Sequence, residues 1–143
     1  CDVLVVEDIR NKETMDVVLE MIEDGHLVIA GINTKSCNEA VERIINFYNQ
    51  EEQAQIKYLL SKLLKLTVSQ KLLLGAKGKL ELLAEVVVTN DSKNSISLID
   101  SLANLYIENR ITLKQAKSQL EEKDLDSLNK TIMKKKLKKE GFI

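Results

Sequence analysis

The chain has 143 residues, of which 44% are apolar and 30% are charged, a balance typical of a globular domain with a buried core. Its formal net charge of −1 excludes a strong overall attraction to nucleic acid or to a membrane surface. Two cysteines without a CxxC pair, and no apolar run of about 20 residues, exclude a disulfide framework and a transmembrane segment and favour a reducing, cytoplasmic compartment.

The first elements of the chain are predicted to alternate between strand and helix. A Val-rich run at residues 3–6 predicts a strand covered on both faces, as in a parallel sheet. Apolar residues at helical spacing predict a helix over about 12–23, with Asn11 as its cap and Gly25 just beyond its end. The apolar run at 26–32 predicts a second short strand.

Two further helices and a hairpin are predicted next. Ser36 and Glu39 have the spacing of a capping box, so a helix is expected to begin after Ser36. Leucines and isoleucines at helical spacing indicate another helix over about 51–65. The runs at 66–74 and 79–89 flank "GAKG", and this pattern predicts a β-hairpin with glycines in its turn.

The last third of the chain is predicted to be helical. Thr112 and Gln115 form a second capping-box pattern, and a charged helix is expected over about 124–139. Alternating strands and helices indicate an α/β fold, here with mainly parallel strands, a β-hairpin and a helical carboxyl-terminal subdomain. We expect a first domain over residues 1–91 and the helical subdomain over 92–143.

Polar side chains follow both of the first two predicted strands. Glu7 and Asp8 end the first strand, and Asn33 and Thr34 end the second. Functional residues of parallel α/β sheets gather at the carboxyl ends of the strands, so this edge is the best candidate for a site. The competing interpretation is an ordinary solvated strand end, and for Arg10 a surface ion pair.

A series of motifs in order resembles a known protein family. The motifs are "DVLVVEDIRNKETM", "GHLVIAGINTKS", "AVERIINFY", "EEQAQIKYLL" and "VSQKLL", and the similarity resumes at "SLIDSLANLYIENRITLKQA". Together they resemble the type II/IV secretion-system ATPases, above all the type IV pilus retraction (twitching-motility, PilT-like) branch. The similarity is close over residues 1 to about 88.

This resemblance implies a RecA-like (P-loop NTPase) core that binds ATP and Mg²⁺. Members of the family form homo-oligomers, commonly hexamers, which couple ATP hydrolysis to pilus assembly, retraction or protein secretion. They are cytoplasmic and work at the inner membrane through a pilus or secretion platform protein. We therefore expect this chain to be the carboxyl-terminal part of such a motor subunit, inactive by itself.

The resemblance also assigns roles to particular residues. The Walker B pattern Gly-Glu-x-Arg-Asp, aligned on Arg10, places Asp8 at the catalytic and metal-binding acid and Glu7 at the glycine. The family's Leu-His-Thr box places Asn33 at the histidine and keeps Thr34. Asp8, Glu7 and Asn33 are thus the catalytic candidates, with Asp8 as the metal ligand, and Arg10 and Thr34 join the nucleotide-binding candidates.

Several departures put hydrolysis in doubt. Asp in place of Glu keeps the charge but shortens the side chain, and a displacement of about 1 Å can cost roughly 100-fold in rate. Glu7 is not a simple substitute for Asp8, because neighbouring strand residues point to opposite faces. Asn33 cannot titrate as the histidine would, although its amide can still bind a phosphate oxygen or water.

Two family segments have no counterpart in the printed sequence. The phosphate-binding loop, G-x-x-x-x-G-K-[ST], is absent, and in the family it precedes the part that this chain resembles. An "AIRNLIRE"-like helix, expected after "AEVVVT", is replaced by "NDSKNSIS". The chain also begins without Met, almost inside a predicted strand. We therefore expect it to be the tail of a longer parent chain, present here either as a fragment of that chain or as the product of a truncated gene.

Three alternatives stay open. The chain can be a degenerate, non-catalytic homologue that serves as a binding or scaffold subunit.

Arg43 matches a family helix that follows the Leu-His-Thr box, which makes it a nucleotide-binding candidate, but it can equally pair with a nearby Glu such as Glu39. The basic end, "KKKLKKEG", suits nucleic acid or acidic lipid, yet it lacks the interleaved aromatics that stack bases. We favour a solvated helix end there and expect no nucleic-acid partner.

Overall fold

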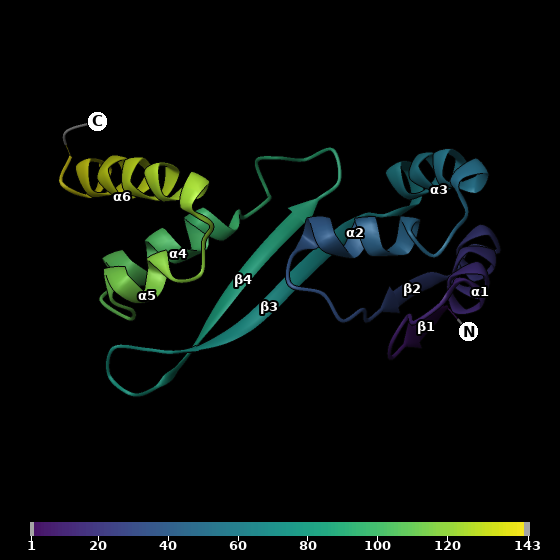
Figure 1. The fold of residues 1–143 in the computed structure, drawn as a ribbon, viewed down its shortest axis with the longest axis horizontal. Coiled ribbons are helices and arrows are strands. Elements are labelled where there is room, and N and C mark those ends of the chain that lie inside the picture. Colours follow the sequence, from purple (N-terminus) through teal and green to yellow (C-terminus); the bar gives the residue numbers. More distant parts are fainter. Residues whose placement is uncertain (1, 142–143) are drawn as a thin grey trace. The chain divides into compact units, whose positions relative to one another are not determined.

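The computed structural model describes residues 2–141 and divides into two compact units. Unit 1 comprises the residues up to 67 together with 88–90, and unit 2 comprises 68–87 and the residues from 91 onward. Each unit has its own hydrophobic core. Figure 1 gives the order of the elements along the chain. The predicted domain boundary after residue 91 stays a prediction.

Unit 1 contains a two-stranded parallel sheet and three helices. They are β1 (Val3–Val6), α1 (Lys12–Glu23), β2 (Leu27–Ala30), α2 (Cys37–Ile45) and α3 (Gln50–Leu63). The predicted parallel pairing is confirmed, with Val3 opposite Leu27 and Val6 opposite Ala30. The connection through α1 is the crossover that parallel strands require.

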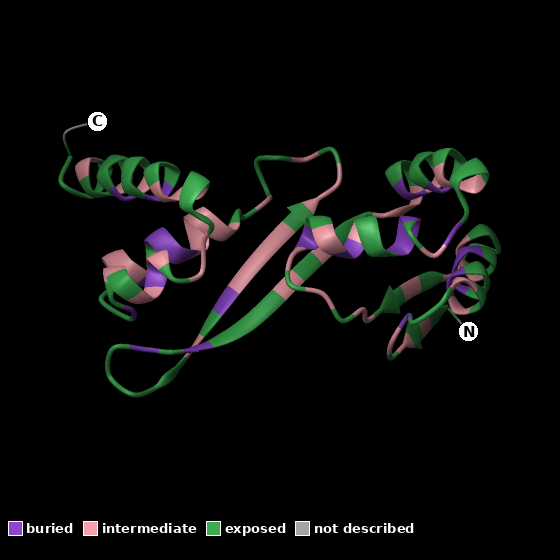
Figure 2. Cartoon of the chain, viewed as in Figure 1, coloured by how far each residue is buried: buried purple, intermediate pink, exposed green. Residues whose placement is uncertain are grey.

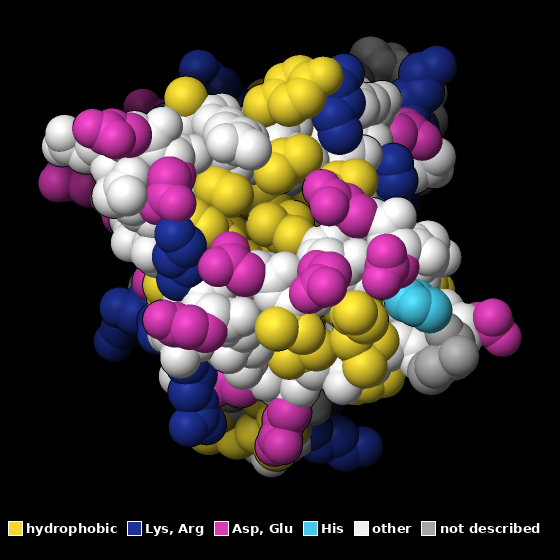
Figure 3. Space-filling model, turned by 90° about the vertical axis from the view of Figure 1, so that its right-hand side faces the viewer, with side chains coloured by type: hydrophobic (Ala, Val, Ile, Leu, Met, Phe, Trp, Pro, Cys, Tyr) yellow, Lys and Arg dark blue, Asp and Glu magenta, His cyan; other side chains and the backbone are white. Residues whose placement is uncertain are grey.

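One face of this sheet is covered and the other is open. The covered face contributes Val6 and Val28 to a core built from α1, α2 and α3. On the other face the exposed fractions are 70% for Val5 and 56% for Ile29. The prediction that β1 is covered on both faces was therefore wrong for the described residues. Figure 3, which views the end of unit 1, shows hydrophobic side chains at the surface among Asp and Glu side chains.

The helix termini of unit 1 follow from local sequence. The Asn11 side chain accepts from the Thr14 backbone N–H at 3.0 Å and caps α1. Gly25 follows α1 with φ +90°, a conformation that favours glycine and that the sequence predicted at this helix end. The Ser36 hydroxyl accepts from the Glu39 backbone N–H at 3.2 Å and caps α2, as predicted.

Unit 2 combines most of the β-hairpin with the carboxyl-terminal helices. Its elements are β3 (Leu66–Leu74, beginning in unit 1), β4 (Leu80–Val88, ending in unit 1), α4 (Leu98–Ile107), α5 (Leu113–Lys117), a single 3₁₀ turn (Glu122–Asp124) and α6 (Leu125–Lys139). The predicted hairpin and the capping box between Thr112 and Gln115 are both confirmed. Leu102 of α4 and Leu128 of α6 are fully buried in the unit 2 core, where these two helices contact each other. Figure 2 shows how far each element of the unit is exposed.

Among the described residues, no helix combines the length and the apolar character that crossing a bilayer would require.

Candidate functional site

The carboxyl ends of β1 and β2 meet at one edge of the unit 1 sheet. Beyond the paired strands, the Gly31 N–H donates to the Val6 carbonyl at 2.9 Å, and the Ile9 N–H donates to the Gly31 carbonyl at 2.8 Å. These bonds hold the loop after β1 against the loop after β2. The sequence-predicted juxtaposition of the Glu7–Asp8 and Asn33–Thr34 loops at one edge is therefore confirmed in its backbone geometry.

Gly31 is the residue that lets the two loops approach so closely. A Cβ atom at this position would lie 2.3 Å from the Glu7 carbonyl oxygen and 3.3 Å from its carbonyl carbon. Because the obstacle is backbone, no rotamer change relieves it. The sequence interpretation missed Gly31, although a glycine directly after an apolar strand was a usable signal for close backbone approach.

Asp8 and Arg10 form an ion pair on the loop after β1. The Arg10 Nε donates to Asp8 Oδ2 at 2.6 Å. Arg10 is largely exposed, with 79% of its side-chain surface accessible, whereas 29% of the Asp8 side chain is accessible. Between them Ile9 is buried in the unit 1 core and anchors the loop. The local part of the site is thus a partly shielded carboxylate that is neutralised by a neighbouring guanidinium.

Glu7 differs from Asp8 in its surroundings. Its side chain is exposed, while its backbone carbonyl faces Gly31. Both residues lie beyond the end of β1, so the prediction that they point to opposite faces stays a prediction.

The loop after β2 is tied to the start of α2. Arg43 Nη1 donates to the Asn33 backbone carbonyl at 3.0 Å. The exposed Asn33 side-chain amide makes no hydrogen bond with the described residues. The Thr34 hydroxyl donates to the Ser36 carbonyl at 3.4 Å. Glu39 accepts from the Lys35 backbone N–H at 2.8 Å, so Glu39 supports this loop and is not the partner of Arg43.

Two polar contacts connect helix α1 to the segments that follow α2. The Tyr48 hydroxyl donates to Asp16 at 2.7 Å, and burial together with this hydrogen bond raises the pKa of Tyr48 far above its usual range. Lys12 pairs with Glu52 at 2.6 Å, and this hydrogen bond lowers the pKa of the Glu52 carboxyl. A buried phenol usually needs a hydrogen-bond partner, and Asp16 supplies it here.

Metal-binding potential is limited to isolated carboxylates. Among residues 2–141, no group of three or more His, Cys, Asp or Glu side chains is arranged to hold a metal ion. Asp8 has one carboxylate oxygen on Arg10, and its other oxygen makes no hydrogen bond with the described residues. Asp8 therefore keeps one carboxylate oxygen that no described residue occupies.

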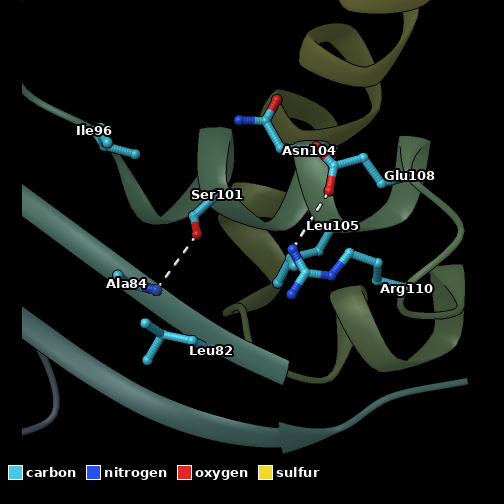
Figure 4. A pocket seen from close by; sticks show the side chains of 8 residues that line it. All are labelled: Leu82, Ala84, Ile96, Ser101, Asn104, Leu105, Glu108 and Arg110. Carbon is cyan, nitrogen blue, oxygen red and sulfur yellow. Dashed lines mark hydrogen bonds and ion pairs between the residues drawn. The ribbon is translucent and has the colours of Figure 1, made fainter. Parts of the chain in front are cut away.

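Unit 2 carries a separate open pocket of about 250 Å³ between β4 and α4. Figure 4 shows the Ala84 N–H donating to the Ser101 hydroxyl, and the ion pair between Arg110 and Glu108. Arg110 also pairs with Glu81, which anchors its guanidinium to the hairpin. Since both carboxylates already neutralise Arg110, the pocket offers no free cation to an anionic ligand.

Sequence comparison places the chain among secretion ATPases. The family profile described as type II/IV secretion system protein matches residues 1–97. The type IV pilus ATPase PilU of Pseudomonas aeruginosa is 37% identical over 78 residues, which cover 54% of this chain and 20% of PilU. The type IV pilus retractation ATPase PilT of the same organism is 27% identical over 105 residues, or 73% of this chain and 30% of PilT.

Structure comparison agrees. The chain superposes on a crystal structure of the pilus retraction motor PilT with bound ADP at a TM-score of 0.79 and a sequence identity of 26%. The superposed part covers 88% of this chain and 42% of that PilT chain. The Legionella pneumophila ATPase DotB shares the fold at a TM-score of 0.75 and 16% identity, over 82% of this chain and 38% of DotB.

The fold class expected from the sequence, the carboxyl-terminal part of a RecA-like secretion ATPase core, is thereby confirmed. The chain spans no more than about a third of the length of these two curated relatives. The profile covers residues 1–97, about two thirds of the chain, including both loops of the candidate site. The chain belongs to the type II/IV secretion system protein family.

Proposed function

We propose that this chain is the carboxyl-terminal part of a PilT-like motor subunit that couples ATP hydrolysis to pilus retraction or to secretion. The observation that carries the proposal is the edge of the β1–β2 sheet, where the backbone bonds around Gly31 hold the Asp8 loop beside the Asn33 loop. Membership in the secretion family supports the same assignment.

Within that motor each polar residue of the edge has a distinct task. The Asp8 carboxylate would hold the metal and its water, and the Asn33 amide would donate to the terminal phosphate. The Thr34 hydroxyl would donate to the same phosphate after turning away from the Ser36 carbonyl. Arg10 sets how much of the Asp8 charge is available, because it occupies one oxygen at 2.6 Å. Arg43 fixes the Asn33 backbone at 3.0 Å and so orients the amide. Glu7 is the weakest catalytic candidate, because it stands where the family's Walker B pattern has a glycine.

This edge would supply only one part of a site for ATP and Mg²⁺, and the phosphate loop would supply the other part. Mg²⁺ in nucleotide enzymes is commonly held by one or two carboxylates together with the phosphates. Asp8 supplies one such carboxylate, and the chemistry that the bound nucleotide and metal contribute is phosphoryl transfer to water. The phosphate loop that cradles the nucleotide must come from the part of the motor that this sequence lacks.

We further propose the assembly that the family resemblance implies. The complete subunit is cytoplasmic, forms a homo-oligomer, expected to be a hexamer, and engages an inner-membrane pilus or secretion platform protein. The open face of the β1–β2 sheet supports a role as part of a larger assembly, because it exposes Val5 and Ile29 to solvent.

A second candidate function is that of a non-catalytic binding or scaffold subunit. The Asp8–Arg10 ion pair favours it, because a carboxylate already neutralised by a guanidinium binds a cation less strongly. Glu7 in place of the Walker B glycine and Asn33 in place of the histidine favour it as well.

Restoring the missing half separates the two candidates. The chain would be joined to the phosphate-loop half of a PilT-like ATPase, and ATP turnover would be compared with that of an Asp8→Glu, Asn33→His version. Under the motor proposal the joined chain hydrolyses ATP, and the restored version does so faster. If neither version turns over ATP although both bind it, the scaffold alternative replaces the motor proposal.

A further inference from the structure

Helix α6 has a buried side and an exposed side with different chemistry. Leu128 and Ile132 point into the unit 2 core. On the same flank, Lys135 is held by Asp100 at 3.0 Å and by the Asn104 side chain at 2.9 Å. These contacts fix the rotation of the helix and therefore decide which residues face solvent.

The exposed side carries an apolar ridge. Met133 has 66% of its surface accessible, and the half-buried Leu137 follows it four residues later, one turn along the same face. Neither side chain belongs to the core cluster of unit 2 or to the hydrophobic residues packed against it. Folding of unit 2 therefore does not require an apolar residue at Met133.

Lysines flank this ridge. Between residues 129 and 139 the chain has six lysines and no acidic residue, while Asp126 and Glu140 lie just outside the two ends of that segment. Lys130, Lys134 and Lys138 are four residues apart and form one row beside the ridge.

This row is largely free of protein partners. None of its three lysines makes an ion pair or hydrogen bond with the described residues, and all three are exposed. Lys134 adds a longer-range attraction to Asp100. Lys136 is turned to the other flank, where it lies over the Tyr106 ring at 5.3 Å.

We propose that the exposed side of α6 docks on an anionic lipid surface. A helix that presents an apolar ridge flanked by lysines can lie in the interfacial plane, with the ridge at the headgroup–acyl boundary and the ammonium groups at the lipid phosphates. Lys130, Lys134 and Lys138 make the charge contacts. Met133 and Leu137 make the apolar ones.

Charge and composition favour lipid over nucleic acid as the occupant. The α6 segment contains no Phe, Tyr or Trp to stack on bases. An apolar ridge gains nothing from a solvated phosphate backbone, whereas it gains hydrophobic free energy at the acyl boundary. This inference does not rest on ATP hydrolysis, so the motor proposal and the lipid proposal can fail separately.

Vesicle binding by the whole chain tests the proposal. The chain would be sedimented with vesicles of phosphatidylcholine mixed with phosphatidylglycerol and, in parallel, with vesicles of phosphatidylcholine alone. We expect binding to the mixed vesicles that weakens steeply with added salt. The Lys130→Gln, Lys134→Gln, Lys138→Gln variant should bind about 100-fold more weakly.

A matched control removes the same charge elsewhere in unit 2. Lys77→Gln, Lys79→Gln, Lys93→Gln changes three exposed lysines in the hairpin turn and the loop before α4, and it should bind as the parent chain does. Met133→Gln keeps every charge and should bind the mixed vesicles about 5–10-fold more weakly. Far-UV circular dichroism verifies that all variants are folded.

Four results would overturn the proposal. The first is equal binding to phosphatidylcholine alone, which would assign the contact to the open sheet face of unit 1. The second is an equal loss in the control triple variant. The third is unchanged binding by Met133→Gln. The fourth is tighter binding to a DNA duplex than to the mixed vesicles, lost in the α6 triple variant, which would assign the lysine row to nucleic acid.

Discussion

Gly31 and Glu7 touch through their backbones, and a Cβ atom at Gly31 would lie 2.3 Å from the Glu7 carbonyl oxygen. The contact joins the ends of two parallel strands, and both loops of the candidate site begin there. The position of Asp8 relative to the Asn33 loop therefore depends on the absence of a side chain at Gly31.

Replacing Gly31 is expected to destabilise unit 1. Gly31→Ala should lower the free energy of unfolding by about 2–3 kcal/mol, because strand pairing must loosen to admit the methyl group. Urea unfolding followed by circular dichroism measures this change. Val17→Ala, at an exposed position of α1, is the control and should change stability by no more than about 0.5 kcal/mol. A Gly31→Ala chain as stable as the parent would contradict the close approach.

Tyr48 gives unit 1 a dependence on alkaline pH. Burial and the hydrogen bond to Asp16 raise its pKa, so the folded chain keeps the phenol proton at pH values where the unfolded chain has lost it. Stability from this group is complete below the unfolded pKa of about 10 and falls as the pH rises beyond it. Tyr48→Phe should remove this part of the pH dependence and cost about 1 kcal/mol near neutral pH.

Chemical denaturation of the Tyr48→Phe chain and its parent, at neutral pH and above pH 10, measures the difference. Tyr58→Phe serves as control because Tyr58 is 63% exposed. Parallel pH profiles for Tyr48→Phe and the parent would show that the Tyr48 phenol ionises alike in the folded and unfolded chains.

Asp100 gives unit 2 a dependence on acidic pH. Its hydrogen bond with Ser97, followed by that with Lys135, lowers the pKa of its carboxyl. Because the folded pKa lies below the unfolded one, this stabilisation is present above the unfolded value and is lost as the pH falls through the folded one. Lys135→Gln should raise the pKa of Asp100 toward its ordinary value, which an NMR titration of the carboxyl carbon detects.

Ser97→Ala probes the same carboxyl together with the helix cap. It should raise the Asp100 pKa as well, and it should cost about 1 kcal/mol of stability through the lost cap of α4. An Asp100 titration unchanged in both variants would refute the assignment.

The open face of the β1–β2 sheet should drive self-association of the isolated chain. Val5 and Ile29 are register partners on this face, and both are mostly exposed. Val5→Lys with Ile29→Lys should shift light scattering toward monomer at high protein concentration. Val17→Lys with Tyr58→Lys adds the same charge at exposed helix positions of unit 1 and should leave the association unchanged. A parent chain that is monomeric at high concentration would contradict the expectation.

Local signals predicted most of the fold. Asn11, Ser36 and Thr112 cap helices as the sequence indicates, because each cap depends only on a few neighbouring residues. The apolar run of β1 predicted the parallel strand but not its open face. Coverage of that face depends on which other segments of the fold are present, and a Val-rich run does not contain this information.

The candidate site was predictable only where a local rule applies. The strand-end rule placed Asp8 and Asn33 at one edge, and strand register bears this out. Gly31 was missed because a side chain is excluded there only by the Glu7 carbonyl of the neighbouring segment. That contact depends on the register between two segments. The Asp8–Arg10 and Arg43–Asn33 pairings depend on side-chain conformations that spacing alone does not fix. The catalytic and binding roles of these residues stay predictions.

ATP turnover in the chain joined to a phosphate-loop half shows whether Asp8 is the working acid of a motor subunit. Asp8→Asn keeps the size of the side chain and removes its charge. Asp2→Asn is the control, because it makes the same change at the residue that precedes β1. We expect Asp8→Asn to lower turnover by about 100-fold or more and Asp2→Asn to leave it unchanged. Equal turnover in Asp8→Asn and the joined parent would show that Asp8 is not the working acid.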